Sequence, residues 1–271
     1  MKHNPLVSVI MPAYKQAEYI GEALDSLLNQ TYKGWEVIVV DDGSPDNVAQ
    51  IVETYSKQDS RIKFYHTENH GVSAARNFAA SKSEGEYLLP LDADDKIAPT
   101  YIQKCVEHFE KYPETTLVYC QWKYFGTKNK ATPLRYKGYK HLLIENSIFN
   151  CAMFRKCDFD RVGGYDENML SALEDWEFLI RLLNADSVVY QIPEVLFFYR
   201  IKPVSRNTVS LHSYDVNNYI YEKHSGLFHR LYGKPIKAYT ESFMYEQRYY
   251  NIWYKKLWYK YIVKDHLECY D

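Results

Sequence analysis

Two hydrophobic patterns alternate along the first hundred residues of the chain. Continuous apolar runs are typical of buried strands, and we expect strands at residues 6–11, 36–40, 61–66 and 87–89. Apolar residues at helical spacing predict a first helix at residues 17–29 and a second that is capped by Asp46 and runs through Tyr55. A third helix is expected at residues 73–81 with Ser73 as its N-cap, and a fourth from about Pro99. This alternation indicates an α/β fold, with a mostly parallel sheet and helices on both faces.

The last quarter of the chain has a different pattern. Residues 213–271 are rich in Tyr, Trp and Lys, and helix breakers are few after Pro235, so we expect a helical extension to a domain at residues 1–212. Aromatic residues fall on nearly every side of the helical wheel. A helix buried in a homo-oligomer interface explains this best, with peripheral membrane contact second and a sugar-stacking acceptor platform third.

Composition and charge narrow the class of protein. The 271 residues carry 33 basic and 35 acidic side chains, and a net charge of −2 predicts no nucleic-acid partner. Five cysteines without a CxxC pair favour reduced thiols. No apolar run approaches the roughly 18 to 20 residues of a membrane span, and the first residues lack a signal peptide's apolar segment. We therefore expect a cytoplasmic protein.

An acidic stretch, Leu91-Asp92-Ala93-Asp94-Asp95, directly follows the fourth predicted strand. Carboxylates at this density repel one another unless a cation lies between them. Mg²⁺ and Mn²⁺ prefer such hard oxygen ligands and usually bind one or two carboxylates together with a substrate diphosphate. A solvated acidic turn before the next helix is the alternative interpretation.

Tyr14, Asp42 and the acidic stretch each lie just past a predicted strand, so we expect them at one rim of the sheet, where α/β folds bind ligands. Tyr14 can stack on a nucleobase or pack under its own loop. Asp42 can accept hydrogen bonds from a base or ribose, whereas Asp41 can bond the adjacent turn. Arg76 can bind the base or the diphosphate, or it can pair with Asp41 or Asp42.

Taken together, these motifs resemble the family 2 glycosyltransferases of the GT-A type, which act in bacterial glycan biosynthesis. The resemblance spans roughly residues 6–200. It is carried by six motifs in order: Val7-Ser8-Val9-Ile10-Met11-Pro12-Ala13-Tyr14, Val39-Val40-Asp41-Asp42-Gly43-Ser44, Gly71-Val72-Ser73-Ala74-Ala75-Arg76-Asn77, Leu91-Asp92-Ala93-Asp94-Asp95, Gly163-Gly164-Tyr165-Asp166-Glu167 and Glu174-Asp175-Trp176. Each motif is weak alone, but their order is specific.

The resemblance implies a GT-A fold and an inverting transfer from a nucleotide sugar, most simply a UDP-sugar. It implies a nucleotide site made by Pro12, Tyr14, Asp42, Arg76 and Asp92. It also implies a Mn²⁺ or Mg²⁺ ion on the diphosphate, held by Asp94, with Asp95 as the second candidate.

Asp175 takes the role of general base in this resemblance, because inversion by one displacement needs a single carboxylate to accept the acceptor's proton. Glu174, Trp176 and Gly164 are implied near the acceptor or the donor sugar. Carboxylates in the first turn of a helix are also favoured by the helix dipole alone, which is the alternative interpretation of Glu174 and Asp175.

The chain departs from the family pattern where relatives often carry a metal-binding histidine after a Tyr-Arg pair. Here Tyr199-Arg200-Ile201-Lys202 has Lys202 at that position. A protonated lysine cannot bind a metal but can offset diphosphate charge directly. His212 is the other candidate to complete the site, although a lone histidine is more often structural.

We therefore expect a transferase that moves a sugar onto a hydroxyl of a glycan, glycoprotein or lipid-linked acceptor, at the inner face of the membrane if the extension binds lipid. The rival from another class is a catalytically silent carbohydrate-binding or assembly subunit. A nucleotidyltransferase would need a glycine-rich loop with a lysine after the first strand, and residues 12–16 are not one.

Overall fold

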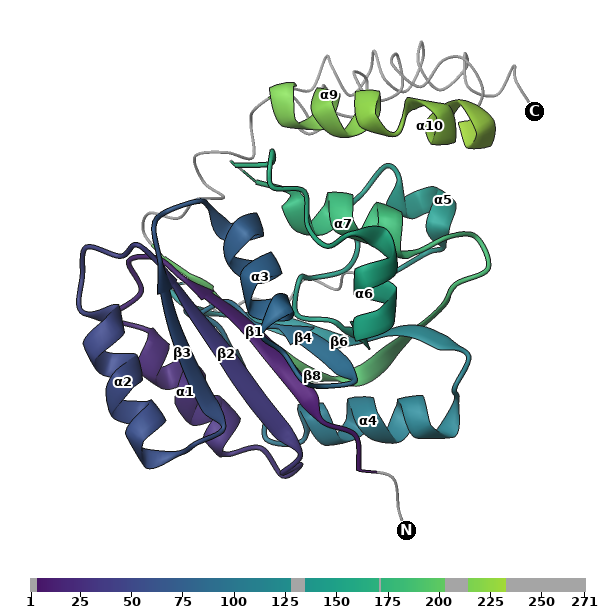
Figure 1. The fold of residues 1–271 in the computed structure, drawn as a ribbon. Helices are drawn as coiled ribbons and strands as arrows, with labels where there is room; N and C mark the ends of the chain where they lie inside the picture. The colour runs from purple at the N-terminus through teal and green to yellow at the C-terminus, as the bar shows by residue number, and fades with distance from the viewer. Residues whose placement is uncertain (1–3, 128–134, 171, 203–213, 233–271) are drawn as a thin grey trace. The chain divides into compact units, whose positions relative to one another are not determined.

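The structure is a computed structural model, and it describes residues 4–127, 135–170, 172–202 and 214–232 (Figure 1). The chain divides into two compact units, Met1–Val216 and Asn217–Asp271. The first unit contains the sheet and all of the predicted motifs.

Within the described residues, eight strands form one sheet in the order β3-β2-β1-β4-β7-β6-β8-β5. The strands are β1 (Val7–Ala13), β2 (Trp35–Asp42), β3 (Ile62–Thr67), β4 (Tyr87–Pro90), β5 (Lys96–Ile97), β6 (Thr115–Gly126), β7 (Met153–Arg155) and β8 (Val188–Ile201). Pairs β1–β2, β2–β3, β1–β4 and β6–β8 are parallel, whereas β7 is antiparallel to β4 and β6, and β5 is antiparallel to β8. The four predicted strands are therefore confirmed as the parallel half of the sheet.

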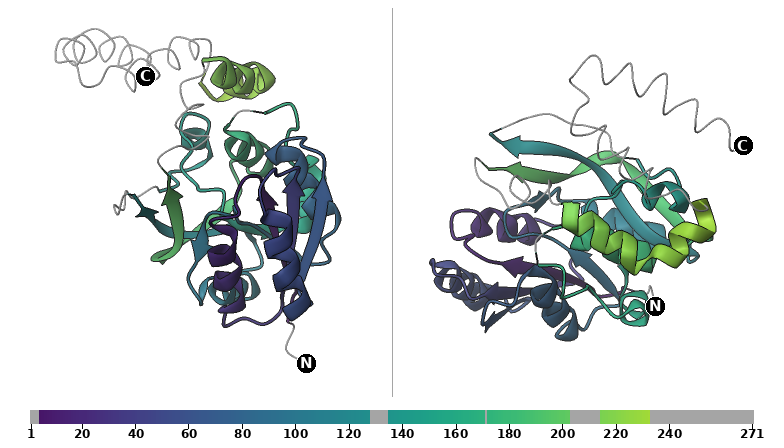
Figure 2. Two further views of the ribbon diagram at one scale, coloured as in Figure 1. Left: turned by 90° about the vertical axis from the view of Figure 1, so that its left-hand side faces the viewer. Right: turned by 90° about the horizontal axis from the view of Figure 1, so that it is seen from above.

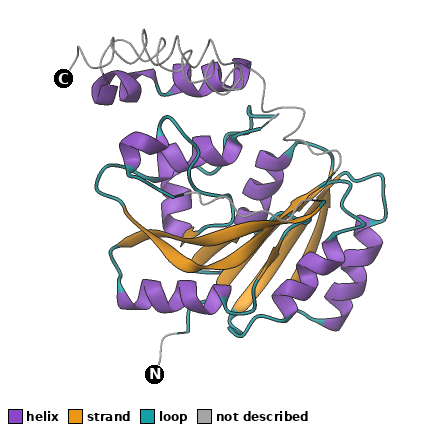
Figure 3. Ribbon diagram, turned by 180° about the vertical axis from the view of Figure 1, so that it is seen from behind, coloured by secondary structure: helices purple, strands orange, loops and turns teal. Residues whose placement is uncertain are grey.

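Helices cover both faces of this sheet (Figures 1 and 3). They are α1 (Ile20–Leu28), α2 (Val48–Gln58), α3 (Val72–Ser81), α4 (Tyr101–Lys111), α5 (Tyr139–Leu142), α6 (Lys156–Val162) and α7 (Glu174–Leu182). Helices α1, α2 and α4 lie on one face and α3, α6 and α7 on the other, with α1 beside α2 (Figures 1 and 2).

The hydrophobic pattern explains this arrangement. Every residue of β1 and β2 is buried, as expected for apolar strands that have helices on both sides. Helix α1 buries only the stripe formed by Ile20, Ala23, Leu24 and Leu27. The carboxyl ends of β1, β2 and β4 consequently form one rim, on which the polar residues that follow each strand are gathered.

Two predicted helix caps are wrong. The N-cap of α2 is Asn47, and Asp46 instead accepts a hydrogen bond from the backbone amide of Ala17 (3.0 Å), which anchors the loop after β1. The N-cap of α3 is Gly71, with a φ of 91°, and Ser73 is buried inside the helix. A positive φ is accessible to glycine without steric cost, so the chain enters α3 two residues earlier than a serine cap at Ser73 predicts.

The C-terminal unit is described only in part. Helix α9 spans Tyr214–Lys223 and α10 spans Ser225–Tyr232, in keeping with the predicted helical extension. The aromatic segment at residues 249–260 lies outside the described residues. The boundary at residue 212, the homo-oligomer interface and the membrane contact therefore stay predictions. None of the helices in the described ranges is both long and apolar enough to span a bilayer.

Candidate active site

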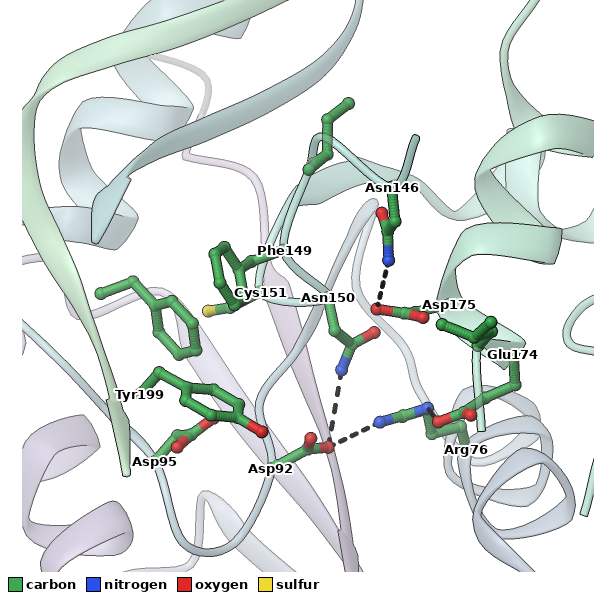
Figure 4. Close-up of a pocket in the computed structure, with 13 residues that line it drawn as sticks. Arg76, Asp92, Asp95, Asn146, Phe149, Asn150, Cys151, Glu174, Asp175 and Tyr199 are labelled. Carbon is green, nitrogen blue, oxygen red and sulfur yellow. Dashed lines mark hydrogen bonds and ion pairs between the residues drawn. The ribbon is translucent and has the colours of Figure 1, made fainter. Parts of the chain in front are cut away.

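The rim of the sheet borders two cavities that share Asp92 and Tyr199. The larger has a volume of about 620 Å³ and the smaller about 250 Å³. Predicted residues that line the larger cavity are Pro12, Tyr14, Asp42, Asp92, Asp94 and Lys202. Predicted residues that line the smaller cavity are Arg76, Asp92, Asp95, Glu174 and Asp175 (Figure 4).

In the larger cavity, the Tyr14 side chain is 42% exposed, so it does not pack under its own loop. Asp42 is buried at the end of β2. Its two carboxylate oxygens accept hydrogen bonds from the backbone amides of His70 (2.8 Å) and Gly71 (2.9 Å). These bonds hold the Asp42 carboxylate at the rim while leaving acceptor capacity for a ligand.

Asp41 makes the turn contact expected of it. Its carboxylate accepts a hydrogen bond from the Ser44 amide (3.0 Å) and contacts His66 Nδ1 (3.0 Å). The Asp41 carboxylate therefore stabilises the turn after β2 and the contact with β3.

The acidic stretch points its carboxylates in different directions. Asp94 Oδ2 lies 2.5 Å from the Lys202 ammonium in the larger cavity, and Lys202 also donates to Gln16 Oε1 (3.1 Å). Asp95 turns toward the smaller cavity and accepts the backbone amide of Arg200 (2.7 Å). Burial, with the charge of Asp94 adding to it, raises the pKa of Asp95 well above its usual value.

This donor set is compatible with a divalent cation that takes most of its ligands from a diphosphate and water. The described part of the chain contains no cluster of three or more His, Cys, Asp or Glu residues with metal-binding geometry. Asp94 is the carboxylate of the pair that lines the larger cavity, whereas Asp95 is engaged by a backbone amide.

Arg76 lines the smaller cavity and contacts Asp92, which lines both cavities. It is 1% exposed, and its guanidinium contacts Asp92 Oδ1 (2.7 Å) and Glu174 Oε1 (2.8 Å). Burial alone disfavours the charged guanidinium, but the two carboxylates raise the Arg76 pKa well above its usual value. The alternative pairing with Asp41 or Asp42 is therefore wrong, because α3 carries Arg76 toward α7.

Helix α7 begins with three carboxylates in its first turn, Glu174, Asp175 and Glu177. Glu174 is paired with Arg76, and Glu177 is paired with Arg181 on the same helix (2.6 Å). Among the described residues, no arginine or lysine forms an ion pair with Asp175. The helix dipole alone does not account for this difference, since it acts on all three side chains.

Asp175 lines the smaller cavity and is held by two donors (Figure 4). Oδ1 accepts the Trp176 amide (2.8 Å) and Oδ2 accepts the Asn146 side-chain amide (3.3 Å). Burial and the neighbouring Glu174 raise the pKa of Asp175 to about 6. A carboxylate with that pKa is ionised at neutral pH, yet is a stronger base than an ordinary aspartate.

The backbone before α7 is strained. Leu173, the N-cap of α7, has a φ of 63°, a conformation that costs a non-glycine residue of the order of 1 kcal/mol. Leu173 also lines the smaller cavity. The strain therefore lies at the point where the chain turns to bring Glu174 and Asp175 to the cavity wall.

Three predicted residues lie away from both cavities or outside the description. Gly164 packs against Asn77, and Trp176 donates from its ring nitrogen to the backbone oxygen of Leu142 (2.6 Å). Neither residue lines the larger or the smaller cavity described above. His212 lies outside the described residues.

Sequence reasoning missed two asparagines of the smaller cavity, Asn146 and Asn150. Asn150 contacts Asp92 (3.5 Å) and accepts a hydrogen bond from the Tyr165 hydroxyl (3.3 Å). Both lie in an irregular segment between α5 and β7, where no periodicity or motif marks them.

Residues 8–163 match the family model described as glycosyl transferase family 2. The chain belongs to this family. The predicted nucleotide-sugar-dependent glycosyltransferase is thereby confirmed at the level of the family. An uncharacterized glycosyltransferase of Rickettsia typhi is 30% identical over 77% of this chain and 68% of its own length. A putative teichuronic acid biosynthesis glycosyltransferase, TuaG of Bacillus subtilis, is 31% identical over 73% of this chain and 80% of its own.

Solved structures share the fold of this family 2 glycosyltransferase. TarS 1–349 of S. aureus, in complex with UDP-GlcNAc, has a TM-score of 0.71 at 19% identity, covering 95% of this chain and 76% of that chain. The mannosyltransferase PcManGT from Pyrobaculum calidifontis, in complex with GDP-Man and Mn²⁺, has a TM-score of 0.65 at 22% identity, covering 80% and 65%. The predicted GT-A fold is confirmed by this likeness.

Proposed function

We propose that this glycosyltransferase transfers a sugar from a UDP-sugar to an acceptor hydroxyl with inversion, using Asp175 as the general base. One observation carries this proposal. Asp175 is the first-turn carboxylate of α7 that no described cationic side chain pairs with, and it lines the smaller cavity, which shares Asp92 and Tyr199 with the larger one. Its raised pKa suits proton abstraction near neutral pH.

The larger cavity is the proposed nucleotide site. Tyr14 offers an exposed aromatic face for the base, and Asp42 offers fixed acceptor oxygens for the base or ribose. Pro12 shapes the wall beside them, and Asp92 lies where the two cavities meet, on the ribose side. Arg76 contributes by holding Asp92, so its role in nucleotide binding is indirect.

The reaction is a single displacement. The acceptor oxygen forms a bond to the anomeric carbon as the bond from that carbon to the diphosphate oxygen breaks. The acceptor's proton passes to Asp175, and the nucleoside diphosphate leaves with the electron pair. Asp175 would lie across the anomeric carbon from the leaving diphosphate, as inversion requires.

Asp94 is the proposed ligand of Mn²⁺ or Mg²⁺, with Asp95 as the second candidate. When bound, the ion neutralises negative charge on the leaving diphosphate. Lys202 supplies a further positive charge to the same cavity. The Mn²⁺ of PcManGT supports the metal proposal by likeness of fold alone.

The acceptor is proposed to be a glycan, glycoprotein or lipid-linked sugar of a bacterial surface polysaccharide. TuaG carries the name of a teichuronic acid enzyme, and WcaA of Escherichia coli, 28% identical, that of a colanic acid enzyme. UDP is supported by the complexes of TarS, whereas GDP-Man in PcManGT makes GDP-sugars the necessary comparison. A cytoplasmic location, expected from the cysteine pattern, belongs to the same proposal.

The test is binding and hydrolysis of a panel of UDP- and GDP-sugars by the purified protein, with Mn²⁺, with Mg²⁺ and with a chelator. We expect one UDP-sugar to bind and to be hydrolysed slowly with metal. Asp175→Asn should abolish turnover but retain donor binding, whereas Asp94→Asn should weaken metal-dependent binding. If no nucleotide sugar binds under any condition, the proposal fails. A catalytically silent assembly subunit then becomes the better hypothesis for the function of this protein.

A further inference from the structure

We propose that Asn146 is a positioning residue for Asp175: its side-chain amide holds the Asp175 carboxylate in the ionised state and fixes its orientation in the smaller cavity. This inference rests on the proposed role of Asp175 as base. It assigns a task to a residue outside the motifs that carry the family resemblance.

The hydrogen-bond geometry supports this role. Asn146 Nδ2 lies 3.3 Å from Asp175 Oδ2, and the Trp176 amide holds Oδ1. An ionised carboxylate can only accept hydrogen bonds, so the asparagine must present its NH₂ group, and its own oxygen must point elsewhere. Each carboxylate oxygen then has one protein donor and a lone pair left for the acceptor hydroxyl.

Asn146 has no other visible structural task. Its contact with Asp175 is the one hydrogen bond that its side chain makes among the described residues, and its Oδ1 atom is buried without a donor there. A residue that only stabilised its own loop would bond that loop. The side chain of Asn146 instead reaches across to α7 and lines the same cavity as Asp175 (Figure 4).

The segment that carries Asn146 is anchored to α7 at two points. The Trp176 ring nitrogen donates to the backbone oxygen of Leu142 (2.6 Å), and the Tyr139 hydroxyl donates to the backbone oxygen of Ile180 (2.9 Å). These contacts bring α5 and the residues after it against α7. The base and its partner thus belong to one packed unit, which is what a precise orientation requires.

The groups around Asp175 act on its pKa in opposite directions, and the Asn146 amide is one of those that lower it. Glu174 lies beside it on α7 and raises its pKa, whereas Arg76 from α3 lowers it. Glu174 and Arg76 carry opposite charges and form an ion pair, so their effects on the Asp175 pKa partly cancel. Tyr165 also interacts with Asp175, and Asp92, Asp95, Cys151 and Tyr199 are further titratable residues that line the same cavity. The amides of Trp176 and Asn146 both favour the ionised form, and only the second belongs to a side chain that can be replaced.

The experiment measures the Asp175 pKa by NMR titration of protein labelled at aspartate carboxyl carbons, with the signal assigned by its loss in Asp175→Asn. The same variants are assayed for the pH dependence of nucleotide-sugar hydrolysis. Asn146→Ala should raise the pKa by roughly half a unit to one unit, because one neutral donor is lost. Asn146→Asp should raise it further, since a second carboxylate faces the first. The acidic limb of the rate profile should move with it.

Asn150→Ala is the matched control, because Asn150 lines the same cavity but contacts Asp92 instead. It should leave the Asp175 pKa in place, whatever it does to turnover. The inference is overturned if both Asn146 variants titrate as the wild type does, or if Asn150→Ala shifts the pKa equally. Absence of nucleotide-sugar binding by the wild type would contradict the proposed function, while the NMR titration would still decide whether Asn146 controls the ionisation of this carboxylate.

Discussion

The guanidinium of Arg76 meets the carboxylate of Glu174 at 2.8 Å, although 98 positions separate them in sequence. Arg76 belongs to α3 and Glu174 to the first turn of α7. The same guanidinium contacts Asp92 on the far side (2.7 Å). One buried cation therefore ties the acidic stretch after β4 to the helix that carries Asp175.

Replacing Arg76 by methionine should destabilise the protein by roughly 3–5 kcal/mol, because it removes the buried cation that pairs with the buried Glu174 carboxylate. Urea unfolding measures this. Arg161→Met is the control, since Arg161 pairs with Asp158 on an exposed surface and its loss should cost about 1 kcal/mol or less. Adding Glu174→Gln to Arg76→Met should recover part of the loss. A cost for Arg76→Met no larger than the control's would contradict a structural role for this pair.

Asp175→Asn should stabilise the protein above pH 6. The Asp175 pKa is about 6 in the folded state against 3.8 as its ordinary value, so the folded state binds the proton more tightly. Ionisation therefore costs stability, and the cost grows from about pH 4 to pH 6 and persists above. The gain in Asp175→Asn should be of the order of 2 to 3 kcal/mol at pH 7.5 and vanish near pH 4.

Thermal or urea unfolding of Asp175→Asn across that pH range checks the sign. The exposed Asp186→Asn is the control and should show no such pH-dependent gain. A destabilised Asp175→Asn at pH 7.5 would show that the carboxylate is not held at an energetic cost.

Lys202→Met should weaken UDP binding by roughly tenfold or more without metal, because a charge-assisted contact to the diphosphate is lost. Calorimetric titration with UDP and with uridine separates the two parts of the ligand. Uridine affinity should not change, since Lys202 lies on the Asp94 side of the cavity. Lys57→Met, on the exposed face of α2, controls for net charge. Equal losses for uridine and UDP would contradict a diphosphate role.

Tyr14→Ala should weaken uridine, UMP and UDP by a similar factor, roughly 5- to 150-fold, because stacking on a base is worth about 1–3 kcal/mol. Tyr112→Ala is a matched control. Its ring is 40% exposed, against 42% for Tyr14, but it lines neither cavity of the site. Unchanged uridine binding in Tyr14→Ala would place the base elsewhere.

Gly164→Ala should destabilise the protein more than Gly163→Ala. Both glycines have a positive φ, 69° and 79°, so both substitutions carry a similar backbone strain. A Cβ at Gly164 would lie 2.5 Å from Asn77 Oδ1, whereas one at Gly163 would meet nothing within 4 Å. Asn77 Oδ1 accepts the Tyr165 amide (2.8 Å), so the clash disturbs that contact as well. Equal unfolding free energies for the two variants would show that Asn77 yields without cost.

Much of the fold could be predicted from the sequence, because burial and periodicity are local properties. The apolar runs of β1, β2 and β4 and the helical spacing of α1 are read directly from adjacent residues. The N-caps of α2 and α3 could not be predicted in this way, since several polar residues near the start of each helix could serve as the cap. The N-cap of α3 depends on the positive φ of Gly71, and that of α2 on the loop that Asp46 anchors.

The motifs likewise determined the family, and with it the rim on which Tyr14, Asp42 and Asp94 lie. Only the tertiary structure decided which groups meet there. Arg76 has Glu174 and Asp92 as partners, Asp94 and Asp95 face different cavities, and Asn146 reaches Asp175 from an irregular segment. The physical reason is that a motif fixes residue type and local conformation, whereas the partner of a buried charge is set by how α3, α5 and α7 pack.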